Sequence, residues 1–272
     1  MAPIVEVQSL TKVFNFRGAG GTAVKAVDDV SFTVAPGTCL GIVGESGSGK
    51  STVARMLFGL ERPTSGVIRV CGMDRSVPAA SLTERKRRAR QMQMVFQDPF
   101  SSLDRRQSGT DCLDEVLRIH FDLKPDDRKQ RIASLADRVG LTEAQLEKSP
   151  RQLSGGQCQR LSIARALAAE PSVLVLDESV SALDVSVQAH LLNQLAEIQE
   201  STGITQIFIS HDLAVINQVT DTVVVMRNGK IVESGATGEV LGRPKHEYTQ
   251  RLRDSVPGRG WSLPSIPVNV EE

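Results

Sequence analysis

The 272-residue sequence predicts an α/β fold, and three observations support this prediction. Short apolar runs, typical of strands that are buried on both faces, alternate with longer helical patterns. The first of these runs, residues 39–43, leads into a glycine-rich turn and then into a stretch of helical composition at 52–60. Between about residues 99 and 171 the strand-like runs disappear and helical patterns dominate, which predicts a helical insertion within the α/β domain.

The composition limits the class of protein. Lys+Arg and Asp+Glu balance at 32 each, so no excess charge draws the chain towards nucleic acid or an anionic bilayer. No apolar run approaches the roughly 20 residues that cross a bilayer, and the first residues lack the pattern of a secretion signal. The four cysteines are widely spaced, which disfavours a metal cluster or a disulfide framework. We therefore expect a soluble, cytosolic protein.

The N-terminal region has the pattern of antiparallel β-structure. Residues 4–7 and 24–34 are rich in β-branched side chains, and the second run ends at the turn 35–37. The glycine-rich residues 17–22 between these runs predict a flexible hairpin loop. An antiparallel β subdomain is therefore expected at the start of the chain.

The alternation of strands and helices returns after residue 171. We expect strands at 173–176, 206–209 and 223–226, and a helix at 185–199. Asn228 and Gly229 predict a tight hairpin turn before the apolar pair 231–232. One more helical stretch follows about residue 243, before a segment with Pro, Gly and Ser that is expected to be poorly ordered.

Residues 44–51 match the phosphate-loop pattern at every position and lie between an apolar strand and a helix. Glycines allow backbone N–H groups to turn inward around phosphates, and the helix adds its positive N-terminal end. We expect Lys50 to reach the terminal phosphates and the Ser51 hydroxyl to bind Mg²⁺, although a chance glycine-rich turn is the alternative. The expected nucleotide contacts in this segment are Gly44, Glu45, Ser46, Gly47, Ser48, Gly49, Lys50, Ser51 and Thr52.

Two acidic residues follow the apolar run 173–176. A strand beside a phosphate loop delivers a carboxylate to the magnesium shell, and Asp177 has this place. Glu178 is then placed to orient or deprotonate the attacking water. The alternative is that Glu178 is a solvated acid at the end of a strand.

A second anion-binding helix start lies in the helical segment. Its residues are Ser154, Gly155, Gly156 and Gln157, and the helix runs to about residue 169. One nucleotide cannot occupy both helix starts, so the second is best explained as serving a partner's nucleotide. The alternative is an ordinary helix with Ser154 as its N-cap.

In this order the motifs strongly resemble the ABC ATPase family over residues 4 to about 242. The resemblance implies a phosphate-loop NTPase core of the ABC type, with an N-terminal antiparallel β subdomain and an inserted helical subdomain. It implies ATP and Mg²⁺ as cofactors. It also implies that residues 153–157 are the signature motif, which closes over the other subunit's ATP in a head-to-tail dimer.

The resemblance assigns roles to four more residues. Gln97 matches the glutamine that touches Mg²⁺ and transmits motion to the membrane partner, and Asp184 belongs to a loop across the dimer interface. His211 matches the switch histidine that contacts the γ-phosphate, and Phe14 matches the aromatic residue that stacks on adenine. The expected catalytic residues are therefore Glu178, His211, Lys50 and Gln97, and the expected metal ligands are Ser51, Gln97 and Asp177.

A closer resemblance is to the peptide and nickel importer subfamily, carried by residues 96–104, 179–188 and 246–252. Ser179 and Glu247 depart from it, since proline is usual at both positions. The resemblance implies an import motor on the cytoplasmic face of the cell membrane, paired with a second, non-identical ABC ATPase subunit. Two transmembrane permease subunits and an extracytoplasmic substrate-binding protein are the further implied partners, and nucleic acid is not. Dipeptide, oligopeptide and nickel remain open as cargo.

The expected organisation is an ATPase core at 1–97 and 172–242, a helical subdomain at 98–171 and a C-terminal extension at 243–272. Two other functions share the ATP chemistry. One is an exporter motor, against which stands only the importer-like flanking sequence. The other is an ABC ATPase that acts on nucleic acid or ribosomes; such proteins usually carry a second cassette, a coiled coil or zinc-binding cysteines, and none is visible here.

Overall fold

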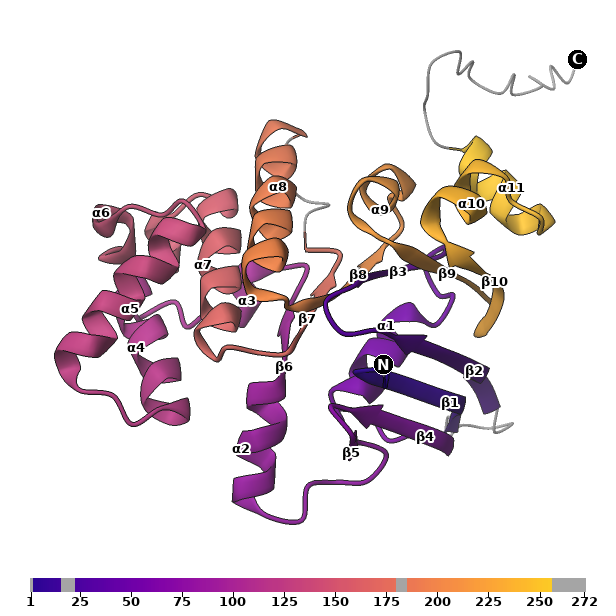
Figure 1. Ribbon diagram of the computed structural model, residues 1–272, viewed down its shortest axis with the longest axis horizontal. Helices are drawn as coiled ribbons and strands as arrows, with labels where there is room; N and C mark the ends of the chain where they lie inside the picture. Colours follow the sequence, from indigo (N-terminus) through magenta and orange to yellow (C-terminus); the bar gives the residue numbers. More distant parts are fainter. Residues whose placement is uncertain (1, 16–22, 180–184, 256–272) are drawn as a thin grey trace, which may run out of the picture.

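The computed structural model describes residues 2–15, 23–179 and 185–255, which form two sheets with helices around them (Figure 1). The larger sheet has six strands in the order β10-β9-β3-β8-β7-β6. The bounds of its strands are β3 Cys39–Val43, β6 Met92–Val95, β7 Val173–Asp177, β8 Thr205–Ser210, β9 Thr222–Arg227 and β10 Lys230–Ala236. The four strands expected at 39–43, 173–176, 206–209 and 223–226 are confirmed.

Five strands of this sheet, β3 and β6–β9, are parallel, and β10 is antiparallel to β9. Asn228 (φ 49°) and Gly229 (φ 78°) join the last two strands in the left-handed region that a tight primed turn requires. The predicted hairpin is therefore confirmed. Because the parallel strands end at the same edge, the loops that follow them converge there.

Alternate residues of the parallel strands enter two different cores, as the period of a strand dictates. In β7, Leu174 and Leu176 pack with the helices, whereas Val173 and Val175 pack with α1 (Lys50–Leu57) and the second sheet. All four side chains are fully buried. Burial on both faces explains why the strand is a continuous apolar run.

The second sheet is antiparallel and has the order β2-β1-β4-β5. In Figure 1 it lies on the side of α1 that faces away from the larger sheet. Its strands are β1 Val5–Asn15, β2 Ala23–Val34, β4 Ser65–Val70 and β5 Met73–Asp74. The predicted antiparallel pairing of the first two strands is confirmed, with Val5 opposite Val34. β1 is longer than expected, and the expected hairpin loop 17–22 lies outside the described residues.

Helices occupy the segment between β6 and β7, as the sequence predicts. They are α3 Pro99–Ser102, α4 Gly109–His120, α5 Pro125–Arg138, α6 Glu143–Leu146, the short 3₁₀ helix η1 Pro150–Gln152 and α7 Gly155–Ala168. In Figure 1 they lie on the opposite side of β6 and β7 from the antiparallel sheet. Helix α7 is at their centre and packs against α3, α4, α5 and β6.

The remaining helices are α2 Leu82–Gln91, α8 Val185–Thr202, α9 Leu213–Val219, α10 Thr237–Gly242 and α11 Glu247–Asp254. Helices α10 and α11 follow β10 and lie at that end of the larger sheet (Figure 1). The segment expected to be poorly ordered falls at 256–272, outside the described residues. In the part of the chain that the structure describes, no helix has both the length and the apolar character to cross a membrane.

Candidate functional site

Four of the expected site segments meet at the carboxyl edge of the larger sheet. The phosphate loop follows β3, Asp177 ends β7, His211 follows β8 and Gln97 follows β6. The ladder places Val43 opposite Ser210 and Asp177 opposite Ile209. The sheet therefore brings together residues that are up to 167 positions apart in the chain, from 44 to 211.

Two glycines of the loop are required by space as well as by backbone conformation. A Cβ on Gly44 (φ 151°) would lie 2.2 Å from the carbonyl oxygen of Met226, and one on Gly49 (φ 107°) would lie 2.5 Å from that of Ala26. Gly47 (φ 81°) has open space on its Cβ side as far as the described residues extend. Gly49 is also the N-cap of α1 and makes no side-chain cap, so the first N–H groups of the helix face the loop.

Lys50 is the first residue of α1, and its ammonium group lies within the loop. Nζ donates to the carbonyl oxygens of Gly44 at 2.7 Å and Glu45 at 2.9 Å. The residue is only 4% exposed. Burial lowers the pKa of Lys50, and the carboxylates of Glu178, Asp177 and Glu45 oppose this shift. The loop therefore holds a buried cation beside the acidic end of β7.

Asp177 has the features of a group that binds a cation. Its Oδ1 is buried and has no hydrogen-bond partner among the described residues. Burial raises the pKa of Asp177 and Glu178 raises it further, while Lys50 and Arg55 lower it. A buried carboxylate oxygen without a donor is costly, and an ion would remove this cost.

These residues fit Mg²⁺, which prefers oxygen ligands and keeps water and phosphate oxygens in its shell. The carboxylate of Asp177 and the hydroxyl of Ser51, the exposed second residue of α1, are the protein oxygens of the right kind. The described residues contain no cluster of three or more His, Cys, Asp or Glu side chains that would bind a metal alone. A shell of few protein ligands, completed by phosphate and water, suits this site.

Glu178 and His211 form a pair at the same edge. His211 Nδ1 lies 3.2 Å from Glu178 Oε1, and the imidazole is 57% exposed. Glu178 has a left-handed backbone (φ 46°), and its N–H donates to the carbonyl of Ile209 at 2.8 Å. Such a conformation in a non-glycine residue is uncommon and is concentrated at functional sites.

Gln97 and Phe14 lie at the margins of this edge. Gln97 is exposed, and Asp98 next to it caps α3 by accepting a hydrogen bond from Phe100 N at 3.0 Å. Phe14 is half-buried near the end of β1, opposite Val24 of β2, with the Lys12 ammonium 4.8 Å from its ring centroid. Ala26 of the same strand approaches Gly49, so Phe14 belongs to a strand pair that borders the loop.

The structure does not bring the second helix start to the phosphate loop. Ser154 caps α7 by accepting from Gln157 N at 3.3 Å, and Gln157 Oε1 accepts from Ser154 N at 3.0 Å. Gly155 is exposed, and beyond its chain neighbours and its own helical turn no atom of the described residues lies within 4 Å of where its Cβ would be. Figure 1 shows α7 and α1 on opposite sides of β6 and β7. Asp184 lies outside the described residues.

One contact to the loop was not expected from the sequence. The hydroxyl of Tyr248, in α11, accepts a hydrogen bond from Glu45 N at 3.0 Å. The resemblance of residues 246–252 to the importer subfamily marks this helix, but it assigns no role to the tyrosine. The two residues are 203 positions apart, so only the fold reveals the contact.

The chain is similar to known proteins along most of its length. The family model described as ABC transporter matches residues 27–181. The oligopeptide transport ATP-binding protein OppD of Mycobacterium tuberculosis (strain ATCC 25618 / H37Rv) is 46% identical over 254 residues, covering 93% of this chain and 41% of that protein. The chain thus spans about two fifths of the length of this relative.

A second relative is covered more fully. OppF of Lactococcus lactis subsp. lactis (strain IL1403), also named as an oligopeptide transport ATP-binding protein, is 45% identical over 234 residues, covering 86% of this chain and 73% of that protein. Among solved structures, a dimeric post-hydrolysis state of the ATP-binding cassette MJ0796 bound to ADP and Pi has a TM-score of 0.76 at 25% identity. It covers 86% of this chain and 98% of that chain.

Proposed function

Because this chain belongs to the ABC transporter family, we propose that it binds ATP with Mg²⁺, hydrolyses it and drives solute import across a membrane. The observation that supports hydrolysis best is the arrangement at the carboxyl edge of the sheet. There the buried Lys50, the buried Oδ1 of Asp177 and the Glu178–His211 pair meet beside one phosphate loop.

In this proposal the loop holds the phosphates through its backbone N–H groups and through Lys50. Ser51, Asp177 and Gln97 would hold Mg²⁺, which supplies charge neutralisation at the phosphate oxygens. Phe14 would stack on the adenine, since only the π-face of an aromatic ring is needed. Thr52, with the remaining loop residues, would complete the phosphate cradle.

Glu178 would orient the attacking water and accept its proton, and His211 would fix Glu178 and contact the terminal phosphate. The 3.2 Å distance between the two side chains allows them to act as one unit. The parallel strands β7 and β8 are hydrogen-bonded neighbours, so the sheet keeps both groups in register.

The exposed start of α7 would serve the nucleotide of a second cassette. Ser154, Gly155, Gly156 and Gln157 offer helix N–H groups at an exposed surface, and they lie away from the chain's own loop. Asp184 would contribute to the same dimer interface. We propose a non-identical partner, because relatives with two different names, OppD and OppF, match this chain equally well.

The membrane partner would dock in a groove beside Gln97, which has a volume of about 660 Å³. Leu60, Val77, Phe96 and Ile119 line the groove and are 40–65% exposed. The exposed Arg62 and Arg85 add positive charge. An amphipathic cytoplasmic helix of a permease subunit, with acidic side chains, fits this mixture of apolar and basic surface.

The names of the relatives favour peptides as the cargo, with two permease subunits and an extracytoplasmic binding protein as the further partners. The chain would then work at the cytoplasmic face of the membrane. Two experiments test the proposal. Lys50→Ala should remove Mg-ATP binding by this chain and lower hydrolysis by the chain copurified with its partner cassette, and affinity capture from native membranes should recover two multi-span proteins. Recovery of ribosomes or DNA instead would contradict it.

A further inference from the structure

The backbone of one loop residue, Glu45, is held from both sides. Its N–H donates to the Tyr248 hydroxyl at 3.0 Å. Its carbonyl oxygen accepts from Lys50 Nζ at 2.9 Å and from Ser48 N at 3.1 Å. The C-terminal helix and the phosphate-binding lysine are therefore joined through a single residue at the entrance of the loop.

Tyr248 has little freedom to leave this contact. It is 2% exposed and belongs to the same core as the helices. The guanidinium group of Arg227 lies 4.8 Å from its ring centroid. A buried ring with a fixed position presents its hydroxyl as a preorganised acceptor, so little further conformational entropy is lost when the hydrogen bond forms.

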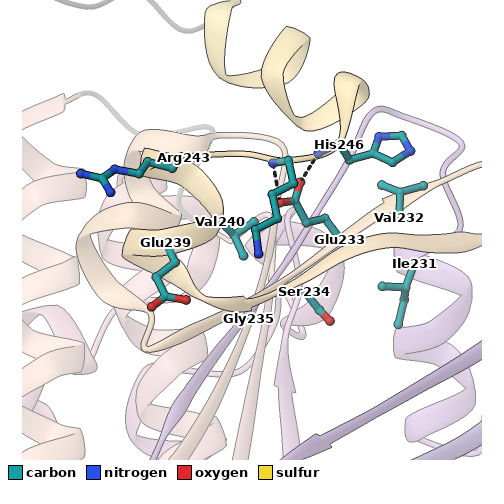
Figure 2. A pocket seen from close by; sticks show the side chains of 10 residues that line it. Ile231, Val232, Glu233, Ser234, Gly235, Glu239, Val240, Arg243 and His246 are labelled. Atoms are coloured by element: carbon teal, nitrogen blue, oxygen red, sulfur yellow. Dashed lines mark hydrogen bonds between the residues drawn. The ribbon is translucent and has the colours of Figure 1, made fainter.

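The start of α11 is fixed in turn by Glu233 of β10. Glu233 accepts from Lys245 N at 2.8 Å through one carboxylate oxygen and from His246 N at 3.2 Å through the other. Figure 2 shows both hydrogen bonds at the wall of the cavity between β10 and α10. His246 Nδ1 accepts from Tyr248 N at 3.0 Å and caps the helix. The path from the sheet to the loop is thus continuous.

We propose that Tyr248 is a positioning residue for nucleotide binding, and that α11 holds the phosphate loop in the conformation that receives the phosphates. The inference rests on the proposed function. With the Glu45 N–H engaged by Tyr248, the plane of the Gly44–Glu45 peptide is fixed, and the Gly44 carbonyl oxygen of that same peptide accepts from Lys50 Nζ at 2.7 Å. The Tyr248 hydroxyl thus acts on the loop, whereas the chemical step belongs to Glu178 and His211, so its effect is on binding.

Removal of the hydroxyl alone tests this role. The full-length Tyr248→Phe variant keeps the ring in the core and removes the acceptor for Glu45 N. We expect the affinity for MgADP and the KM for ATP to worsen about three- to tenfold, as for the loss of one neutral hydrogen bond. The kcat should stay within about twofold of the original value, because the hydroxyl contributes to the loop in the ground state and the transition state alike.

Two controls separate positioning from packing. Gln250→Ala removes a hydrogen bond within the same segment, from Gln250 Nε2 to the Pro244 carbonyl, without touching the loop. It should leave the affinity for MgADP unchanged. The melting temperature without nucleotide should be similar for both variants, whereas the increase caused by MgADP should be smaller in Tyr248→Phe.

A second measurement needs no substitution at this position. Tyr248 is the only tyrosine in the sequence, so the chain labelled with 3-fluorotyrosine gives one ¹⁹F resonance. Saturation with MgADP should shift this resonance, and Lys50→Ala should abolish the shift at the same nucleotide concentration. An unshifted resonance, or an unchanged MgADP affinity in Tyr248→Phe while Lys50→Ala no longer binds, would overturn the role of Tyr248 alone. A wild-type chain that does not bind MgADP would overturn the proposed function as well.

Discussion

His211 Nδ1 lies 3.2 Å from Glu178 Oε1, although the two residues follow different strands. The N–H of Glu178 donates to the carbonyl of Ile209, two residues before His211. The same pair of strands therefore positions both side chains and the backbone that carries them. Because the backbone and the side chain of Glu178 are both held in place, a substitution at this residue tests its proposed role as general base directly.

Glu178→Gln should slow ATP hydrolysis by about 100- to 10,000-fold, the usual contribution of a general base. The amide keeps the size of the side chain but does not accept a proton from water. Equilibrium ATP affinity should remain within about twofold, since Lys50 and the loop are unchanged. Phosphate release and nucleotide binding measured on the same preparation check this, and near-normal turnover would remove Glu178 from the catalytic role.

Asp177→Asn should stabilise the fold and abolish Mg-dependent turnover. Burial, together with Glu178, raises the pKa of Asp177, so the folded chain binds a proton at this group more tightly than the unfolded chain does. The protonated carboxyl group of Asp177 therefore contributes stability that is fully present below the ordinary pKa of an aspartate and is lost as the pH rises through the raised pKa. The Asn substitution, which does not titrate, avoids this loss. Melting temperatures in EDTA should be higher for the variant at pH 7.

The same comparison below about pH 3.9, the ordinary pKa of an aspartate, is the control. There the carboxyl group is protonated in both the folded and the unfolded chain, so the advantage of the Asp177→Asn variant over the original chain should disappear. A variant that melts lower than the original chain at pH 7 would contradict the cost assigned to the buried carboxylate oxygen.

Gly49→Ala and Gly155→Ala form a matched pair with opposite expected effects. The methyl group at Gly49 would lie 2.5 Å from the Ala26 carbonyl oxygen and force a strained backbone, so the free energy of unfolding should fall by about 1–3 kcal/mol. Gly155 is helical, and its Cβ would meet no atom of the described residues, so alanine should stabilise the fold by up to about 1 kcal/mol. Denaturant unfolding measures both values.

The same Gly155→Ala variant also tests the dimer. If α7 covers a partner's nucleotide, the added methyl group occupies space needed at the interface, and ATP-dependent association of the Glu178→Gln chain with its partner cassette should weaken. Size-exclusion chromatography of the two cassettes together, with and without ATP, gives this result. An equally strong dimer would indicate that the exposed helix start is an ordinary capped terminus.

Glu233→Ala should release the start of α11 and weaken MgADP binding. Burial acts to raise the pKa of Glu233, but hydrogen bonds, among them those from the amides of Lys245 and His246, together outweigh it and hold the pKa below its ordinary value. The stabilising effect of this carboxylate is therefore fully present above about pH 4.3 and is lost as the pH falls through the lowered pKa.

Hydrogen exchange at the Lys245 and His246 amides should accelerate in the Glu233→Ala variant at pH 7. Glu239→Ala, in the same cavity, is the control and should leave these amides protected.

Much of the fold was predictable because its signals are local. The strand at 173–176 is apolar at every position since both of its faces are covered, and the Asn228-Gly229 turn needs two residues that tolerate positive φ. Helix α2 gives a weaker signal in the sequence for the opposite reason. It has no buried residue, so it has no apolar stripe to give a helical period.

The candidate site was predicted in part for the same reason. The phosphate loop is contiguous, and the acidic pair at 177–178 directly follows a recognisable strand. The left-handed backbone of Glu178 and the contact between Tyr248 and Glu45 depend on neighbours far along the chain, and no spacing in the sequence encodes them. The burial of Lys50 likewise follows from packing between two sheets rather than from its motif.

The central position of β3 also has a consequence for how the chain folds. Both of its neighbours, β8 and β9, come from residues 205–227, and the hydrogen bond from Gly37 N to Thr205 Oγ1 spans 168 residues. During synthesis on the ribosome, the strand that carries the phosphate loop therefore has no ladder partner until most of the chain has emerged. Such long-range pairing folds slowly, and it exposes an apolar strand in the meantime. Nascent chains should accordingly acquire nucleotide affinity late, when β8 and β9 close the middle of the sheet.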